Sequence, residues 1–348
     1  MKKALNYSPG QLLYKGIIGT GGIGTGWFFQ LNGNHTLGRE ESRSGRFLKI
    51  HDYCKLHIIL HYVRVLMGDH FRTIPIGRVG MDEPGKTLLR EMENTGFIMD
   101  YVKEDSDSST LFSFCYYYPD GTGGNLTTDN SACSKVDESL VLEAEEEIKH
   151  MGKKGIVLAV PEVPLEARKF LLQLGKKYGA FCAASFTREE IIGNQCMQLF
   201  PYADIIALNR EEAFALCGKN SSGVKMDELP ENCLRILRQF NPDMIISVTC
   251  GNDGSIFSDG KETSFFPACK VKAENTAGAG DAYFAGLLSG IALGLKFSHA
   301  QQLATLVAGL SVTSKDTINK GIDRDSLREF LPKAGINISN PIQTLLNN

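Results

Sequence analysis

Short apolar runs alternate with amphipathic stretches along most of the chain. Apolar residues that recur three or four positions apart predict helices, and short continuous apolar runs predict buried strands. Beyond residue 135 the pattern predicts helices over 136–150, 164–178, 210–217, 229–240, 279–293 and 299–313, and strands over 155–160, 180–185, 205–208 and 244–249. Strands that alternate with helices imply right-handed crossovers. We therefore expect a mainly parallel sheet covered by helices.

The first part of the chain follows the same pattern with one interruption. It predicts strands at 16–18 and 72–79 and helices at 52–68 and 86–94. Residues 98–130 differ, because a strand-like run is followed by a Pro-Asp-Gly turn at 119–121 and a glycine-rich segment, which predicts a hairpin. Other short strand-like runs lie between 24 and 50. The segments of about 24–50 and 98–130 are therefore expected to form a small β-sheet set apart from the main body.

Composition supports one folded α/β domain. The chain has 348 residues, of which 43% are hydrophobic, and this is enough for a large core without disulfide bonds. We expect a single domain over 1–348, with a short C-terminal tail at 336–348. The 37 basic and 40 acidic side chains give a net charge of −3, which argues against a surface for nucleic acids.

Cysteine usage and hydropathy favour a cytoplasmic protein. The nine cysteines are scattered, odd in number and without a Cys-x-x-Cys pair, which fits reduced thiols better than a disulfide framework or a zinc site. No apolar run approaches the roughly 18 residues of a membrane helix. The N-terminal Met-Lys-Lys is not followed by a signal-like apolar stretch. We therefore expect no membrane partner and no nucleic-acid partner.

The strongest candidate for chemistry is the stretch Asn-Thr-Ala-Gly-Ala-Gly-Asp at 275–281, which leads directly into a long apolar helix. Gly278 and Gly280 permit a tight turn and close approach of a ligand, and the amides at a helix N-terminus favour an anion. Asp281 would repel that anion unless it accepts a proton from an attacking hydroxyl while the amides hold a phosphoryl group. From the residues alone, a structural glycine-rich helix start, whose acidic first turn suits the helix dipole, stays an equal alternative.

This stretch resembles the C-terminal signature of the PfkB (ribokinase-like) carbohydrate kinases, Asp-Thr-x-Gly-Ala-Gly-Asp. Further segments resemble motifs of that family in the same order: Gly-x-Val-Gly-x-Asp-x-x-Gly within 76–85, a strand leading into Asn-x-x-Glu at 203–212, and Thr-x-Gly-x-x-Gly within 248–254. The resemblance covers roughly residues 15–335, and four motifs in the same order argue against coincidence. The resemblance implies a three-layer α/β sandwich with a mainly parallel sheet and a small β-sheet lid.

The resemblance also implies a catalytic centre. Asp281 would be the catalytic base, and the backbone amides of Gly278, Ala279 and Gly280 would form the anion hole. Such amides are suited to stabilising charge on a transferring phosphoryl group.

The same resemblance implies a nucleotide site. Asn209 and Glu212 would organise Mg²⁺ and the phosphates of ATP, with Glu212 acting through water, while Thr249, Gly251 and Gly254 would line the nucleotide. Mg²⁺ prefers carboxylate, phosphate and water oxygens. Asn209 and Glu212 also have the spacing of a helix capping box, and both roles can hold together.

The sequence departs from the family pattern in two places. Asn275 stands where the family usually has Asp, a position that in relatives often helps to bind a monovalent cation, so K⁺ as a cofactor stays open. The family's Gly-Gly-x-x-x-Asn sugar motif is replaced by Lys-Ile-His-Asp-Tyr-Cys-Lys at 49–55. The substrate-site candidates there are Asp52 and Lys55, and the alternative is a helix N-cap and a solvated lysine.

Two other patterns indicate different chemistry. Residues 19–24 satisfy Gly-x-Gly-x-x-Gly after a predicted strand, as in dinucleotide-binding proteins, but 25–34 do not favour the required helix. We expect a glycine-rich strand exit beside the sugar cleft. His57 and His61 would share a helix face, as metal ligands can, but no third ligand accompanies them and packed or surface histidines are expected.

The resulting hypothesis is ATP-dependent phosphorylation of a hydroxyl on a sugar or sugar-like small molecule. The resemblance further implies a homodimer that pairs through the lid. A small aromatic sheet has unpaired edges and an apolar face, and pairing with a second copy would shield both from water. Two alternatives stay open. One is a nucleoside kinase of the same superfamily, in which lid aromatics stack on a base. The other is a catalytically silent ligand-binding or regulatory protein on this fold.

Overall fold

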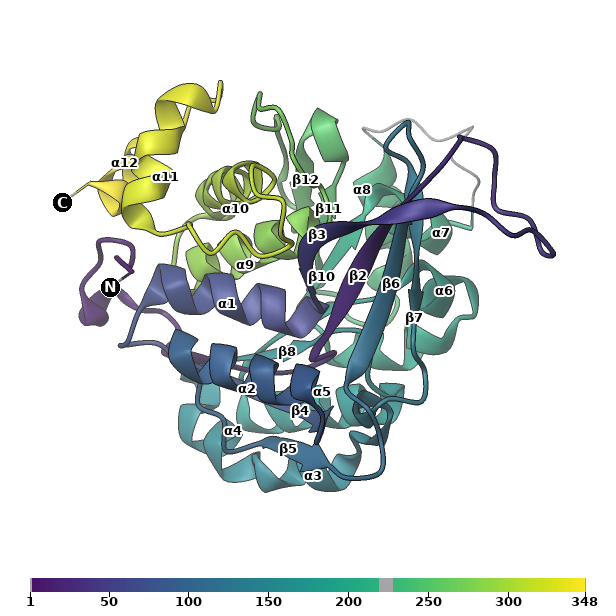
Figure 1. Ribbon diagram of the computed structural model, residues 1–348. Coiled ribbons are helices and arrows are strands. Elements are labelled where there is room, and N and C mark those ends of the chain that lie inside the picture. The colour runs from purple at the N-terminus through teal and green to yellow at the C-terminus, as the bar shows by residue number, and fades with distance from the viewer. Residues whose placement is uncertain (1, 219–227, 348) are drawn as a thin grey trace.

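The computed structural model describes residues 2–218 and 228–347. A large sheet lies between two layers of helices, and a small sheet lies beside them (Figure 1). The large sheet has the strand order β13-β12-β11-β10-β9-β8-β1-β4-β5. Its strands are β1 (Gly16–Thr20), β4 (Arg72–Gly80), β5 (Val102–Asp105), β8 (Gly155–Ala159), β9 (Phe181–Ser185), β10 (Ile205–Asn209), β11 (Ile245–Thr249), β12 (Ser255–Ser258) and β13 (Thr263–Phe266). All neighbouring pairs are parallel except β11–β12 and β12–β13, so only β12 runs in the opposite direction, which confirms the predicted three-layer α/β sandwich.

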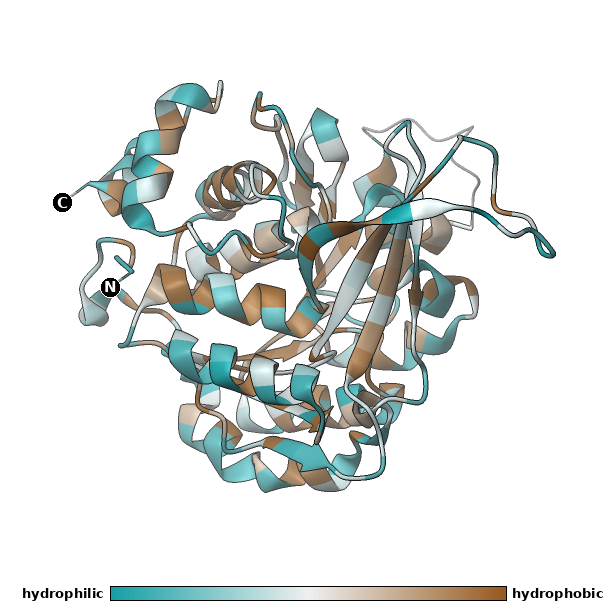
Figure 2. Cartoon of the chain, viewed as in Figure 1, coloured by the Kyte–Doolittle hydropathy of each residue, from teal (hydrophilic) through white to brown (hydrophobic). Residues whose placement is uncertain are grey.

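The two helical layers bury opposite faces of this sheet. Side chains alternate along each strand, so Ile17 and Ile18 of β1 belong to different hydrophobic cores. One layer contains α1 (Lys55–Met67), α2 (Glu83–Thr95), α9 (Ala279–Ala292), α10 (Phe297–Ser311), α11 (Arg324–Phe330) and α12 (Asn340–Leu346). The other contains α3 (Glu138–Glu143), α4 (Glu145–Met151), α5 (Leu165–Tyr178), α6 (Arg188–Ile192), α7 (Arg210–Leu216) and α8 (Leu229–Leu237). In Figure 2 the outward surface of α2 is largely hydrophilic, as expected for a helix with one buried face.

The small sheet, called the lid sheet below, has the order β3-β2-β6-β7. Its strands are β2 (Gly24–Leu31), β3 (Gly45–Tyr53), β6 (Leu111–Tyr117) and β7 (Gly123–Thr127). The predicted lid boundaries need correction at two points. Residues 102–105 form β5, which pairs with β4 in the large sheet, so the second lid segment begins near residue 111 rather than 98. The first lid segment runs past 50, because β3 stays paired with β2 as far as Tyr53.

Three predicted elements differ locally from the structure. The helix expected over 136–150 is divided at Ala144, whose ψ of 4° leaves the helical range. The helix expected from 52 begins at Lys55, because Asp52 and Tyr53 still belong to β3. The expected tail at 336–348 instead contains α12, which buries Ile342 and Leu346 at helical spacing.

The glycine-rich residues 19–24 are not a dinucleotide fingerprint, because β1 continues into the strand β2 and not into a helix. Gly22 instead leaves space for the Glu162 side chain, because a Cβ at position 22 would lie 2.0 Å from Glu162 Oε2. His57 and His61 are buried in α1, and within the described residues no three metal-ligating side chains gather. None of the nine cysteines, all of which are described, forms a disulfide bond. Across the described ranges, no helix is long and apolar enough to span a bilayer.

Candidate active site

The carboxyl ends of the parallel strands meet at one edge of the large sheet. At this edge Asn209 of β10 is in register with Thr249 of β11, and Thr20 of β1 is in register with Ala159 of β8. A cavity of about 440 Å³ is lined by the first turn of α9, the start of α1 and the inner side of the lid sheet. Open α/β sheets bind their ligands outside this edge. We call this cavity the acceptor cavity.

Asp281 and Lys55 face each other in the acceptor cavity. Lys55 Nζ lies 3.4 Å from Asp281 Oδ1, and the two side chains are 28% and 16% exposed. Burial raises the pKa of Asp281, and the Lys55 ammonium opposes that shift. In turn, the Asp281 carboxylate raises the pKa of Lys55 above its ordinary value. The substrate-site candidate from α1 and the candidate base from α9 therefore form one ion pair.

The start of α9 has the geometry of an anion site. Gly278 is the N-cap residue with φ 78°, a left-handed conformation that favours glycine. A Cβ at this position would lie 2.8 Å from Thr317 O, so both the torsion and the space require glycine. The amide of Ala279 donates to Thr276 O over 3.2 Å. The Ala279 amide can therefore bind an anion only if it gives up this hydrogen bond. In this respect it differs from the amides of Gly278 and Gly280 in the predicted anion hole.

Asn209 and Glu212 form the capping box that their spacing predicts. Asn209 Oδ1 accepts from the Glu212 amide over 2.9 Å, and Glu212 Oε2 accepts from the Asn209 amide over 2.8 Å. Glu212 is only 8% exposed, and burial raises its pKa while Lys55 opposes the shift. Glu212 caps α7 and still belongs to the site, because its carboxylate interacts electrostatically with Lys55 and Asp281.

The donor set suits a Mg²⁺ ion that is held mainly by ATP. The described residues contain no group of three or more His, Cys, Asp or Glu side chains placed to hold a metal. Mg²⁺ keeps several waters and commonly binds through one or two carboxylates and substrate phosphates. Glu212 supplies a carboxylate of this kind at the start of α7. It therefore fits an ion that is held indirectly, through water.

The predicted nucleotide loop lies next to the start of α9. Thr249 ends β11, and its Oγ1 would be 4.0 Å from a Cβ at Gly280. Gly251 and Gly254 have φ of 58° and 115°, and a Cβ at Gly254 would lie 2.1 Å from Phe266 O. Arg210 holds the loop by donating to Cys250 O over 2.8 Å. The loop thus has a fixed backbone beside the proposed anion hole, and its role in nucleotide binding stays a prediction.

Asp52 lies on the cavity wall, and its alternative role as a helix N-cap is wrong. It belongs to β3, while the N-cap of α1 is Cys54. Asp52 is 6% exposed, and burial raises its pKa to about 6. On the lid sheet, Cys115 Sγ lies 3.7 Å from Asp52 Oδ2. The lid therefore covers a buried carboxyl group at the cavity.

Glu162 is a cavity residue that the sequence analysis did not identify. It lies shortly after β8, and its backbone has φ 78°. Its Oε2 accepts a hydrogen bond from the Lys55 amide over 3.4 Å. Burial raises the pKa of Glu162 to about 7, opposed by the Lys55 charge. An acidic residue directly after a buried strand, at the edge where ligands bind, was the signal available in the sequence.

Asn275 connects the lid sheet to the start of α9. Its Oδ1 accepts from the Ala277 amide over 2.9 Å and from the Tyr117 hydroxyl over 3.2 Å. Its Nδ2 donates to Lys315 O over 2.7 Å. A carboxylate could not make the last bond, because it has no hydrogen to donate. Asparagine therefore fits this position through a donor that the family's usual aspartate lacks.

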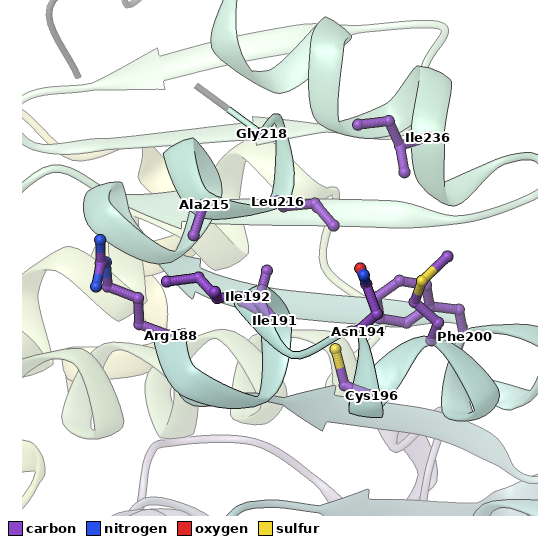
Figure 3. A pocket seen from close by; sticks show the side chains of 11 residues that line it. Arg188, Ile191, Ile192, Asn194, Cys196, Phe200, Ala215, Leu216, Gly218 and Ile236 are labelled. Atoms are coloured by element: carbon purple, nitrogen blue, oxygen red, sulfur yellow. The ribbon is translucent and has the colours of Figure 1, made fainter. Parts of the chain in front are cut away.

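A second cavity, of about 350 Å³, lies elsewhere (Figure 3). It is formed by α6, α7, α8 and the 3₁₀ helix η4 (Gln195–Tyr202). Apolar side chains such as Ile191, Leu216 and Ile236 line it together with the polar Arg188 and Asn194. None of the predicted catalytic or nucleotide-site residues lines it. Of the predicted site residues, Asp52, Lys55, Gly278 and Asp281 line the acceptor cavity, whereas the predicted nucleotide residues lie outside its lining.

Comparison with known proteins agrees with this architecture. Residues 66–324 match the pfkB family carbohydrate kinases. Ribokinase of Schizosaccharomyces pombe is 25% identical over 245 residues, which are 69% of this chain and 73% of that protein. Adenosine kinase of Saccharomyces cerevisiae is 23% identical over 250 residues, covering 69% and 72%. The structure of ribokinase from Giardia lamblia superposes with a TM-score of 0.77 at 18% identity, covering 92% of this chain and 99% of that one. Because the family match spans most of the sequence, the chain belongs to the pfkB family of carbohydrate kinases.

Proposed function

We propose that this ATP-dependent kinase transfers the γ-phosphoryl group of ATP to a hydroxyl of a sugar or sugar-like small molecule, with Asp281 as the base. The observation that carries the proposal is the position of Asp281. It lies in the first turn of α9, on the wall of a cavity covered by the lid sheet, and 3.4 Å from an ammonium group. A carboxylate in that position can accept a proton from a hydroxyl bound in the cavity.

Each element of the site has a physical role in this reaction. Lys55 keeps Asp281 ionised before transfer, and the amides at the start of α9 offset charge on the phosphoryl group. Mg²⁺, held through Glu212 and water, would neutralise charge on the ATP phosphates. The lid sheet limits access of water, which would compete with the acceptor hydroxyl.

The direct test is ADP release from Mg·ATP over a panel of sugars, polyols, sugar acids, sugar phosphates and nucleosides. Turnover with one acceptor class supports the proposal and names the class. Nucleosides belong in the panel for a specific reason: the rings of Phe28 and Tyr117 line the cavity with centroids 5.4 Å apart, a surface on which a base can stack. Tight binding of an acceptor without any ADP release would instead favour a silent binding protein.

The outer face of the lid sheet supports a homodimer. Trp27, Phe47 and Leu126 are 57%, 57% and 61% exposed on the lid strands. Phe112 packs edge-on against Trp27, Phe29 and Phe114 pack edge-on against Phe47, and the rings of Trp27 and Phe47 also meet edge-on. Phe29 and Phe114 are tilted against each other. We call these six residues the aromatic patch. Exposed apolar patches of this kind mark interaction sites, and a second copy of the lid sheet presents a matching surface.

Phe47→Asp should convert the dimer to a monomer. The substitution places a charge at the centre of the aromatic patch, where burial in an interface would carry a high desolvation cost. Sedimentation velocity over a range of concentrations measures the result. The matched control is Phe265→Asp, because Phe265 is 59% exposed on β13, outside the aromatic patch. A wild-type protein that sediments as a monomer at all concentrations would contradict the proposed dimer.

Turnover should not require K⁺. With an aspartate at position 275, its carboxylate oxygen would face Lys315 O, and a cation could bridge the two oxygens. Asn275 Nδ2 instead donates a hydrogen bond to Lys315 O, so no cation is needed there. Replacing K⁺ by tetramethylammonium should leave the wild-type kcat unchanged. Asn275→Asp should lower kcat several-fold without K⁺ and regain it with K⁺, because the carboxylate would face Lys315 O. Strong K⁺ activation of the wild type would contradict this interpretation.

A further inference from the structure

We infer that the acceptor is an uncharged polyhydroxy compound, and that the cavity excludes acceptors that carry a phosphate or a carboxylate. The inference rests on the proposed function and specifies the substrate class of the same site. It follows from the charges and polar groups on the cavity wall.

Acidic groups outnumber basic groups around the acceptor cavity. Asp52, Glu162 and Asp281 all line it. Among the described residues of its lining, Lys55 is the one basic side chain. Glu212 adds a further carboxylate close enough to act on Lys55 and Asp281. Even with Glu162 protonated, the wall carries no surplus of positive charge.

Lys55 is already engaged, so it is not available to an anionic substituent. Its ammonium lies 3.4 Å from Asp281 Oδ1 and also faces Glu162 and Glu212. A phosphate or carboxylate on the acceptor would have to draw Lys55 away from Asp281. That exchange would leave Asp281 without its partner in a partly buried site, which is costly.

The remaining polar groups suit hydroxyls. Ser113 and Thr317 contribute hydroxyl side chains, Asn125 contributes an amide and Tyr117 contributes a phenol, all on the cavity wall. Carboxylates such as Asp52 accept strong hydrogen bonds from hydroxyl groups. Sugars and polyols offer many such donors, whereas an added phosphate or carboxylate offers only acceptors.

The basic side chains of the lid strands, Arg46, Lys49 and His51, do not line the cavity. Arg46 of β3 is exposed and donates to Gln30 Oε1 within the lid sheet. It does not line the cavity. The amides at the start of α9 can bind an anion, but the proposed mechanism uses them for the phosphoryl group that is transferred. An anionic acceptor therefore has no cationic counterpart of its own.

The test compares matched pairs of acceptors that share a skeleton: ribose with ribose 5-phosphate, fructose with fructose 6-phosphate, and glucitol with gluconate. Binding is measured by calorimetry and turnover by ADP release from Mg·ATP. The uncharged member of at least one pair should bind, and its kcat/KM should exceed that of its anionic counterpart by roughly a hundredfold or more, since like-charge juxtaposition costs several kcal/mol.

Two variants separate charge from shape. Asp52→Asn and Glu162→Gln each remove one carboxylate at nearly constant volume, and each should reduce the preference for the uncharged member by about tenfold. Two positions are used so that loss of folding in one does not end the test. Asp100→Asn is the matched control, because Asp100 is exposed and outside the cavity lining, and it should leave the preference unchanged.

The outcomes distinguish this inference from the proposed function. If an anionic member binds or reacts as well as its uncharged counterpart, and ADP release depends on Asp281, the inference is wrong and the kinase reaction stands. If ADP release persists in Asp281→Asn, the proposed role of Asp281 fails. If no uncharged member of any pair binds, the inference is overturned as well.

Discussion

Asp281→Asn should lower kcat by about a thousandfold while the affinity for Mg·ATP stays within a few-fold of the wild type. A positioned general base contributes roughly 10² to 10⁴ in rate, and an asparagine amide cannot accept the hydroxyl proton. A thousandfold loss corresponds to about 4 kcal/mol of transition-state stabilisation. Nucleotide binding should be largely retained, because the predicted nucleotide residues lie at the end of β10, at the end of β11 and in the loop after β11.

Steady-state kinetics with a saturating acceptor measures kcat, and calorimetry with a non-hydrolysable ATP analogue measures binding. Asp100→Asn makes the same chemical change at an exposed position outside the cavity and should behave like the wild type. A kcat for Asp281→Asn within tenfold of the wild type would remove Asp281 from the role of base.

Gly278→Ala should reduce kcat by about a hundredfold and lower the free energy of unfolding by about 1–3 kcal/mol. Alanine is disfavoured at φ 78°, and its Cβ would lie 2.8 Å from Thr317 O. The backbone must shift to relieve that contact. Since Gly278 caps α9, the shift moves the amides that are proposed to stabilise the phosphoryl group.

Gly280→Ala is the matched control for this glycine. Its Cβ would meet only Thr249 Oγ1 at 4.0 Å, and Gly280 is not among the residues with positive φ. Gly280→Ala should therefore retain the stability of the wild type in urea denaturation. Unchanged kcat and unchanged stability in Gly278→Ala would show that the start of α9 tolerates movement and is not a preorganised anion hole.

Local patterns in the sequence predict most of the fold. Apolar periodicity is a property of neighbouring residues, so it predicts both the order of strands and helices and the family motifs between them. It misplaces β5, because whether Val102–Asp105 joins the large sheet or the lid sheet depends on pairing with β4. It misses the helical packing of α12, because the burial of Ile342 and Leu346 depends on distant helices.

In the candidate site, too, local motifs could be predicted and long-range contacts could not. Asp281 and Gly278 could be predicted because their chemistry lies within one short motif. The pairing of Lys55 with Asp281 could not, because the two residues lie far apart in the sequence and meet only when α1 and α9 pack together. For Glu162 the sequence shows only that an acidic residue follows a buried strand, because its contact with the Lys55 amide forms only in the folded chain.

The single tryptophan of the chain, Trp27, lies within the aromatic patch and is 57% exposed. Intrinsic fluorescence excited at the indole therefore comes from this one surface, without any label. When water leaves the indole, its emission moves to shorter wavelength. A dilution series of the unmodified protein should then show a red shift as the subunits separate, and its midpoint would give the dissociation constant of the dimer.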